Sequence, residues 1–216
     1  MVFNKVLGFI WVLLYLAIIS IFGCSQNIVL TISSDKPGAV LLNEEPVEDH
    51  LSISRHASVN FNGTDADQVL QTATDVARTT DGPDDVECDI TLNRHVSVAE
   101  FTNAATPAFI DDWESYDAVA HDNPSDVKVL AGMDWCNRKF QPNVLLGCTG
   151  ASDSMTVVTD LPINQLAPDD AKRLKGIMWL HEYGHLKGLD HRNDANAVMN
   201  EEVEPYNTRL NETECG

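Results

Sequence analysis

The chain has 216 residues, of which 33 are Asp or Glu and 14 are Lys or Arg, so its formal net charge at pH 7 is −19. Such an acidic surface repels nucleic acid, and the chain contains no basic run that could follow a phosphate backbone, so the composition argues against a nucleic-acid partner. The length fits a single domain with a modest hydrophobic core, which we expect to be a monomer.

Residues 1–24 are typical of an export signal, because Lys5 precedes an apolar run from Val6 to Phe22 that contains no acidic residue. The run ends in Ile21-Phe22-Gly23-Cys24, which resembles a bacterial lipobox, although Phe22 is bulkier than the residue usual there. We therefore expect a lipoprotein of the cell envelope that carries lipid on Cys24. An uncleaved single-pass anchor and ordinary secretion remain alternatives. All three place the remaining chain outside the cytosol, with membrane contact only through this lipid or anchor.

Residues 25–57 have mixed composition, with turn signals at Asp35-Lys36-Pro37-Gly38, and predict a tether that contains at most a short hairpin. The pattern of a folded domain begins at residue 58, so we expect the folded domain to span 58–216. Residues 58–61 are expected to form its first strand, and the apolar spacing in 65–79 predicts a helix.

Further elements follow in chain order. Residues 88–101 are rich in β-branched side chains and predict a strand or hairpin, whereas 103–126 read as a loop-rich insert in which Trp113 and Tyr116 cover the core. Strands are expected at 127–135, 144–149 and 155–159. A second long helix is expected to begin near Pro168, because Asp169 and Asp170 suit the first turn of a helix.

The most informative stretch is 176–200, which contains His181-Glu182-Tyr183-Gly184-His185, then Gly188 and His191. Two histidines four residues apart project from one face of a helix and can share a metal ion. Glu182 can reach a water on that metal. Gly188 can adopt the left-handed conformation that ends a helix, so that the chain turns back and His191 supplies a third ligand. Three protein ligands are typical of catalytic zinc sites, whereas structural sites use four.

Together with Met199, these residues match H-E-x-x-H-x-x-G-x-x-H followed by a methionine turn, and the chain therefore resembles the metzincin clan of zinc endopeptidases. The resemblance implies an α+β, zincin-type fold with a twisted, mostly parallel sheet, two long helices and a small irregular C-terminal subdomain. It also implies that Met199 forms an apolar floor beneath the zinc ligands. Arg192 follows the third histidine and Glu201 lies two residues beyond Met199, which differs from the better-known families, so we assign no family within the clan.

The resemblance implies one catalytic Zn²⁺ held by His181, His185 and His191. It implies hydrolysis of protein or peptide substrates by a zinc-activated water, with Glu182 as the general base. A different interpretation is a catalytically weak, zinc-bearing surface binding or adhesion module on a protease scaffold. The intact Glu182 argues against that interpretation.

Setting Cys24 aside, the remaining cysteines are Cys88, Cys136, Cys148 and Cys215, an even number that predicts two disulfides in an exported chain. Four cysteines allow three pairings, of which we favour Cys136–Cys148 and Cys88–Cys215. A free Cys88 that inhibits the zinc as a ligand is a weaker alternative.

Two further expectations concern substrate specificity and calcium binding. In the metzincin clan, the edge strand of the sheet aligns the substrate, for which 144–149 is the candidate, and the segment after the methionine turn borders the pocket for the residue after the cut. That segment is Glu201-Glu202-Val203-Glu204-Pro205-Tyr206 here, so a glutamate that faces the pocket would favour basic side chains. Calcium is possible at the acidic loops 81–89 and 111–114, but neither has a calcium-loop spacing, which favours solvated acid.

Overall fold

The computed structural model describes residues 47–82, 85–136, 139–140, 145–150, 155–158 and 166–215, and for 139–140 and 155–158 the backbone alone. These residues belong to one compact unit, Glu44–Gly216. The expected export signal, its Cys24 and most of the expected tether lie outside the described residues. Within the described ranges, no helix combines the length and apolarity needed to cross a membrane.

A mostly parallel sheet forms the centre of the unit, and its five strands lie in the order β10-β11-β6-β2-β4. Their bounds are Gly147–Thr149 (β10), Met155–Val158 (β11), Val127–Leu130 (β6), Ile53–Arg55 (β2) and Ala99–Glu100 (β4). All neighbours are parallel except β10, which runs antiparallel to β11 at one edge. A single residue separates β2 from β1 (Val47–Leu51). β1 pairs in parallel with β3 (Ile90–Arg94). The prediction of a mixed α and β architecture with a mostly parallel sheet is confirmed.

The sheet begins earlier in the chain than the sequence analysis predicted. β1 and β2 lie within 47–55, which was expected to be tether, and the expected first strand at 58–61 is a turn in which Val59 N–H donates to His56 O. The reason is that the first residues of β1 are polar and exposed to solvent, so its sequence does not show the apolar pattern that is typical of a strand. Burial begins only at Leu51 and Ile53, which are 4% and 1% exposed.

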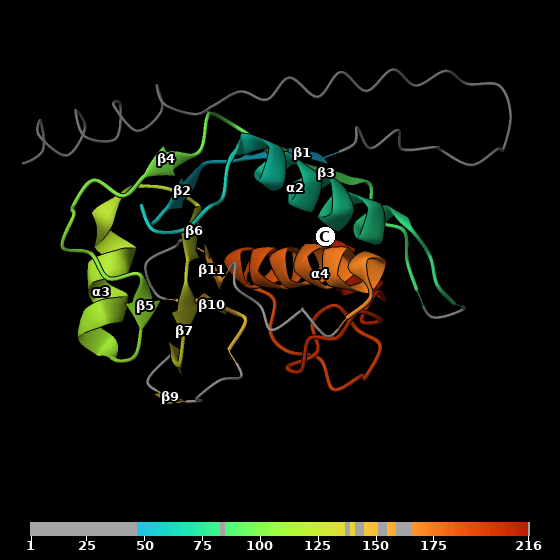
Figure 1. Ribbon diagram of the computed structural model, residues 1–216. Helices are drawn as coiled ribbons and strands as arrows, with labels where there is room; N and C mark the ends of the chain where they lie inside the picture. Colours follow the sequence, from blue (N-terminus) through green and yellow to red (C-terminus); the bar gives the residue numbers. More distant parts are fainter. Residues whose placement is uncertain are drawn as a thin grey trace, which may run out of the picture. The chain divides into compact units, whose positions relative to one another are not determined.

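The two long helices that were predicted are present, and α2 (Gly63–Arg78) and α4 (Pro168–Leu186) pack side by side in Figure 1. Asn62 caps α2 through a capping box with Asp65, and a proline opens α4. The helices approach closely because Gly176 has no side chain. A Cβ at Gly176 would lie 2.6 Å from Thr72 Cγ2.

Two segments between the long helices differ from expectation. Residues 88–101 form two separate strands rather than a hairpin, because β3 pairs with β1 and β4 pairs with β2, both in parallel. Residues 103–126 are not mainly loop, since they contain the helix α3 (Trp113–Asp122), which Asp112 caps, and the strand β5 (Phe109–Ile110). The region predicted as one strand, 127–135, is divided into β6, β7 (Gly132–Met133) and the start of β8 (Trp135–Cys136), which pairs with β9 (Lys139–Phe140).

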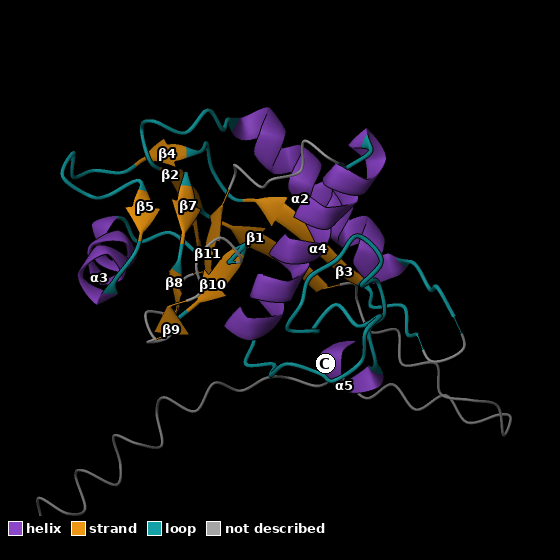
Figure 2. Ribbon diagram, turned by 60° about the horizontal axis from the view of Figure 1, so that its bottom comes forward, coloured by secondary structure: helices purple, strands orange, loops and turns teal. Residues whose placement is uncertain are grey.

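After Gly188 the chain forms loops on one side of α4, with the short helix α5 (Glu212–Cys215) near its end (Figure 2). The expected irregular C-terminal part is therefore present. Both favoured disulfides, Cys88–Cys215 and Cys136–Cys148, are formed, which rules out a free inhibitory thiol at Cys88. Two disulfides fit a chain that folds in an oxidising compartment.

Candidate metal centre

Three histidine side chains converge at the C-terminal end of α4. His181 and His185 lie one turn apart on the helix, and Gly188, with φ of +87°, turns the chain so that His191 faces them. His185 Nε2 lies 3.0 Å from His181 Nε2 and 3.0 Å from His191 Nε2. Among the described residues, these three form the one group of His, Cys, Asp or Glu that could hold a metal ion.

Backbone carbonyls orient two of the rings. Nδ1 of His181 lies 2.8 Å from Val198 O, and Nδ1 of His185 lies 2.7 Å from Leu189 O. A carbonyl only accepts hydrogen bonds, so each Nδ1 carries the proton and each Nε2 presents a lone pair. Burial lowers the pKa of His181 to about 4 and also lowers that of His185, which keeps both rings neutral. Neutral imidazole is the form that binds metals.

Glu182 places a carboxylate beside the histidines. Its side chain is buried, and Thr149 of the edge strand β10 donates a hydrogen bond of 2.7 Å from Oγ1 to Glu182 Oε2. A second contact of 3.0 Å joins Thr149 Oγ1 to the backbone carbonyl of Glu182. Gly147 leaves room for the carboxylate, because a Cβ there would overlap Oε1. Burial raises the pKa of Glu182 to about 8, and the hydrogen bond from Thr149 opposes that rise.

Met199 is 1% exposed and packs on α4 next to the second histidine. A Cβ at Gly184 would overlap Met199 Sδ, so a glycine at this position allows the sulfur to approach the helix. The Met199 carbonyl accepts a hydrogen bond of 2.7 Å from Arg192 N–H. The methionine is therefore linked to α4 on one side and to the chain just after His191 on the other.

A cleft of about 730 Å³ opens onto the three histidines and Glu182. One wall consists of residues 145–150, which include β10, the edge strand of the sheet. The prediction that 144–149 supplies an edge strand beside the site is confirmed for β10. The lining of the cleft also includes Asp190 and, as expected, residues 201–204, three of which are glutamates.

The acidic loops considered for calcium form no metal-binding group among the described residues. Their side chains serve the fold instead: Asp112 accepts a hydrogen bond from Ser115 N–H at the start of α3, and Asp85 accepts one from Leu210 N–H. Residues 83 and 84 of the first loop lie outside the described part of the chain.

The chain matches no known protein-family model and no curated protein sequence. The interpretation of the site therefore depends on its own geometry.

Several residues at the site were not anticipated. Thr149, Gly147 and the carbonyls of Leu189 and Val198 all contact the histidines or Glu182 from other segments of the chain. The role of Gly184 could have been predicted from the sequence, because a glycine inside a helix is unfavourable unless a neighbouring side chain needs the space. The carbonyl contacts have no sequence signal, since every residue carries a carbonyl.

Proposed function

We propose that the protein is a zinc-dependent endopeptidase of the metzincin type. The observation that carries this proposal is the convergence of three imidazole nitrogens beside the buried carboxylate of Glu182, at the bottom of a cleft with an edge strand on one wall. The residues of the motif, which are scattered between positions 181 and 199, thus lie together.

The donor set fits zinc. At zinc–nitrogen distances of about 2.0–2.1 Å and tetrahedral angles, ligand nitrogens lie roughly 3.3 Å apart. The separations of 3.0 Å from His185 Nε2 to its two neighbours are close to that value. The proton on Nδ1 of His181 and His185 directs lone pairs toward a common point, where they repel one another unless a cation lies between them. Three imidazole ligands with a fourth position open to water are found in catalytic zinc sites, although imidazole also suits copper, iron and nickel.

A zinc ion bound by these residues would supply Lewis acidity, lowering the pKa of water and polarising the scissile carbonyl. The positive charge of the metal would oppose the effect of burial and favour the ionised form of Glu182, which then accepts the proton of the attacking water and delivers it to the leaving amine. Thr149 holds the Glu182 carboxylate in place through its hydrogen bond of 2.7 Å. β10 pairs with β11 alone among the described strands, so its outer edge would orient an extended peptide by strand addition, with the scissile bond across the cleft.

The experiment that tests this proposal compares the purified wild type with Glu182→Gln. We expect both to bind one equivalent of zinc, since Glu182 is not a ligand, while the rate of casein cleavage falls by about 10²–10⁴-fold in the variant. Chelation should abolish wild-type cleavage, and added zinc should restore it.

Glu114→Gln, which removes an exposed carboxylate of α3, serves as the matched control and should cleave like the wild type. A Glu182→Gln variant with wild-type activity would remove Glu182 from the role of base. Zinc bound by the wild type without cleavage of casein, gelatin or a peptide library would favour the surface binding module instead.

A further inference from the structure

The third histidine depends on a different kind of support from the first two. His181 and His185 are fixed by α4 and by the carbonyls that hold their Nδ1 atoms. His191 is exposed and lies in a loop, and no described residue forms a hydrogen bond with its Nδ1. Its position therefore depends on the backbone that carries it.

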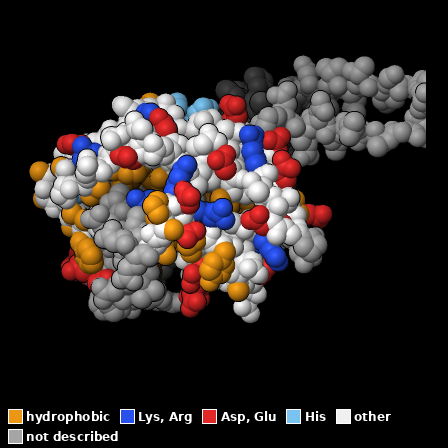
Figure 3. All heavy atoms as spheres, turned by 45° about the vertical axis from the view of Figure 1, so that its right-hand side comes forward, with side chains coloured by type: hydrophobic (Ala, Val, Ile, Leu, Met, Phe, Trp, Pro, Cys, Tyr) orange, Lys and Arg blue, Asp and Glu red, His pale blue; other side chains and the backbone are white. Residues whose placement is uncertain are grey.

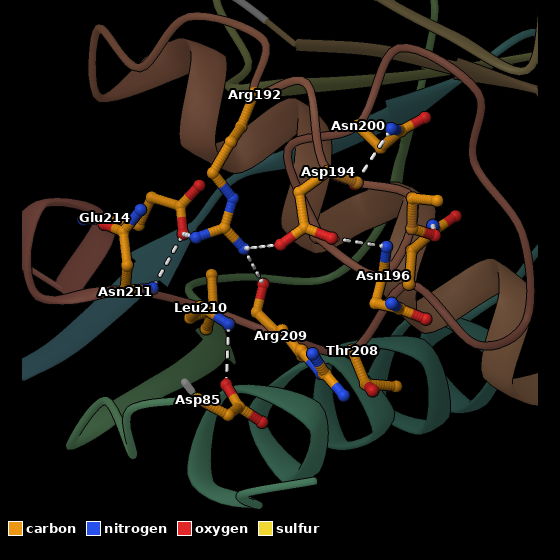
Figure 4. Close-up of polar contacts among 12 residues, drawn as sticks. Asp85, Arg192, Asp194, Asn196, Asn200, Thr208, Arg209, Leu210, Asn211 and Glu214 are labelled. Carbon is orange, nitrogen blue, oxygen red and sulfur yellow. Dashed lines mark hydrogen bonds and ion pairs between the residues drawn. The ribbon is translucent and has the colours of Figure 1, made fainter. Parts of the chain in front are cut away.

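Arg192, the next residue, contacts four residues that follow it in the chain, and Figure 4 shows the three of them that contact its guanidinium. Its N–H donates to Met199 O at 2.7 Å, and Nη2 donates to Arg209 O at 2.9 Å. Nη1 lies 3.2 Å from Glu214 Oε2, and Nη2 also lies 3.8 Å from Asp194 Oδ2. The guanidinium thus occupies a fixed orientation in which both of its terminal nitrogens have partners.

The C-terminal tail that receives Arg192 is itself firmly held. The Glu214 side chain is 6% exposed, and its carboxylate accepts a further hydrogen bond of 2.8 Å from Asn211 N–H. Asp85 accepts a hydrogen bond of 2.7 Å from Leu210 N–H (Figure 4). Cys215, the residue after Glu214, is disulfide-bonded to Cys88. Arg192 therefore connects the third histidine to an anchored tail rather than to a free chain end.

We propose that Arg192 is a positioning residue for the metal centre, and that residues 209–215 set the place of His191 through it. The proposal depends on the metal site of the proposed function but not on catalysis. In metal sites, residues that orient a ligand typically change metal affinity 10–100-fold when they are removed. Because Glu214 is buried, removal of Arg192 also leaves an unpaired carboxylate, so a loss of stability has to be measured separately.

The test measures zinc affinity by competition with a chromophoric chelator, and measures unfolding of the zinc-free protein by urea. We expect Arg192→Ala to weaken zinc binding by about 10–100-fold at a temperature at which the variant is folded. Arg192→Lys keeps the charge but cannot contact Arg209 O and Glu214 together, so it should also lose affinity and provides the test if the alanine variant does not fold.

Arg94→Ala is the matched control. Its side chain is 23% exposed, against 22% for Arg192, and it forms a comparable two-nitrogen pair with Asp67 at 2.9 Å, away from the cleft. We expect Arg94→Ala to change the free energy of unfolding and to leave the zinc affinity equal to that of the wild type. Glu214→Gln, which keeps the shape of the side chain, should weaken zinc binding in the same direction as Arg192→Ala.

Zinc affinity in folded Arg192→Ala and Arg192→Lys within two-fold of that in Arg94→Ala would overturn the proposal and leave Arg192 with a purely structural role. These results are distinguishable from a failure of the proposed function. A wild type that binds zinc but cleaves nothing would refute the peptidase and leave the affinity comparison intact.

Discussion

At the scale of single residues, the candidate site depends on how Glu182 is held. The carboxylate is buried between α4 and β10, and Thr149 is the side chain that donates to it. A hydrogen bond to a charged group contributes about 1.5–3 kcal/mol, which corresponds to roughly one to two powers of ten in rate when the bond is needed for orientation.

We therefore expect Thr149→Val, which keeps the shape of the side chain but lacks the hydroxyl, to lower kcat about 10–100-fold on a peptide substrate. Thr149→Ser keeps the donor and is the control, with kcat near that of the wild type. Equal rates in the valine and serine variants would show that the hydroxyl does not orient Glu182.

Some residues of the site could be identified from the sequence alone, and others could not. His181, Glu182 and His185 were predictable because the helix period alone fixes their relative directions. Gly188 was predictable from the turn that must end the helix, and its φ of +87° confirms the conformation. Thr149 was not, because its contact with Glu182 joins residues 33 positions apart, and such a pairing depends on the completed sheet.

At the scale of elements, the crossing of α2 and α4 decides where the histidines lie relative to the sheet. The crossing point is Gly176, where an added Cβ would lie 2.6 Å from Thr72 Cγ2 and 3.0 Å from the Thr72 carbonyl carbon. Because one of these atoms belongs to the backbone, a side-chain rotation alone cannot relieve the overlap.

We expect Gly176→Ala to destabilise the protein although alanine is the better helix former. The gain in helix propensity is roughly 0.5–1 kcal/mol, whereas overpacking a buried contact costs about 1–3 kcal/mol. The free energy of unfolding in urea measures the balance. Arg173→Ala, an exposed change on the same helix, should stay within about 0.5 kcal/mol of the wild type. A Gly176→Ala variant more stable than the wild type would contradict the close crossing.

Prediction of elements succeeded for the long helices and failed for short ones. The apolar spacing of 65–79 identified α2, and Pro168 with the acidic residues of the first turn identified α4. Only Tyr116 and Val119 are buried among the ten residues of α3, which is too few for a visible period, although Asp112 and Ser115 carried a capping signal. β1 was missed because most of it is exposed, so burial leaves little pattern in its sequence.

At the scale of the whole molecule, charge is the dominant property. On the face shown in Figure 3, Asp and Glu side chains are spread over the surface among Lys and Arg side chains. The cleft differs from that mixed surface, because the described residues that line it include Asp190 and the glutamates of 201–204 but no Lys or Arg.

We expect the cleft to prefer peptides with Lys or Arg after the cut. Profiling a peptide library measures this preference, which should fall when Glu201, Glu202 and Glu204 are all changed to Gln. Each exposed charge pair contributes about 0.2–1 kcal/mol, so we expect a combined effect of a few-fold to about 100-fold that weakens at high salt.

The control removes three exposed charges elsewhere, at Glu87, Asp111 and Glu114, which leaves the lining of the cleft unchanged. A library profile indifferent to Lys and Arg in the wild type would show that the glutamates face solvent without influence on specificity. A preference lost equally in the control would assign it to the net charge of the protein rather than to the cleft.

The Cys88–Cys215 disulfide joins residues 127 positions apart in the sequence. The segment that it anchors also receives Arg192, so under the proposal above the support of the third histidine is complete only after this disulfide has formed. Thiols stay reduced in the cytosol. A copy kept in a reducing compartment is therefore expected to bind a metal at the three histidines less firmly than one whose disulfide has formed.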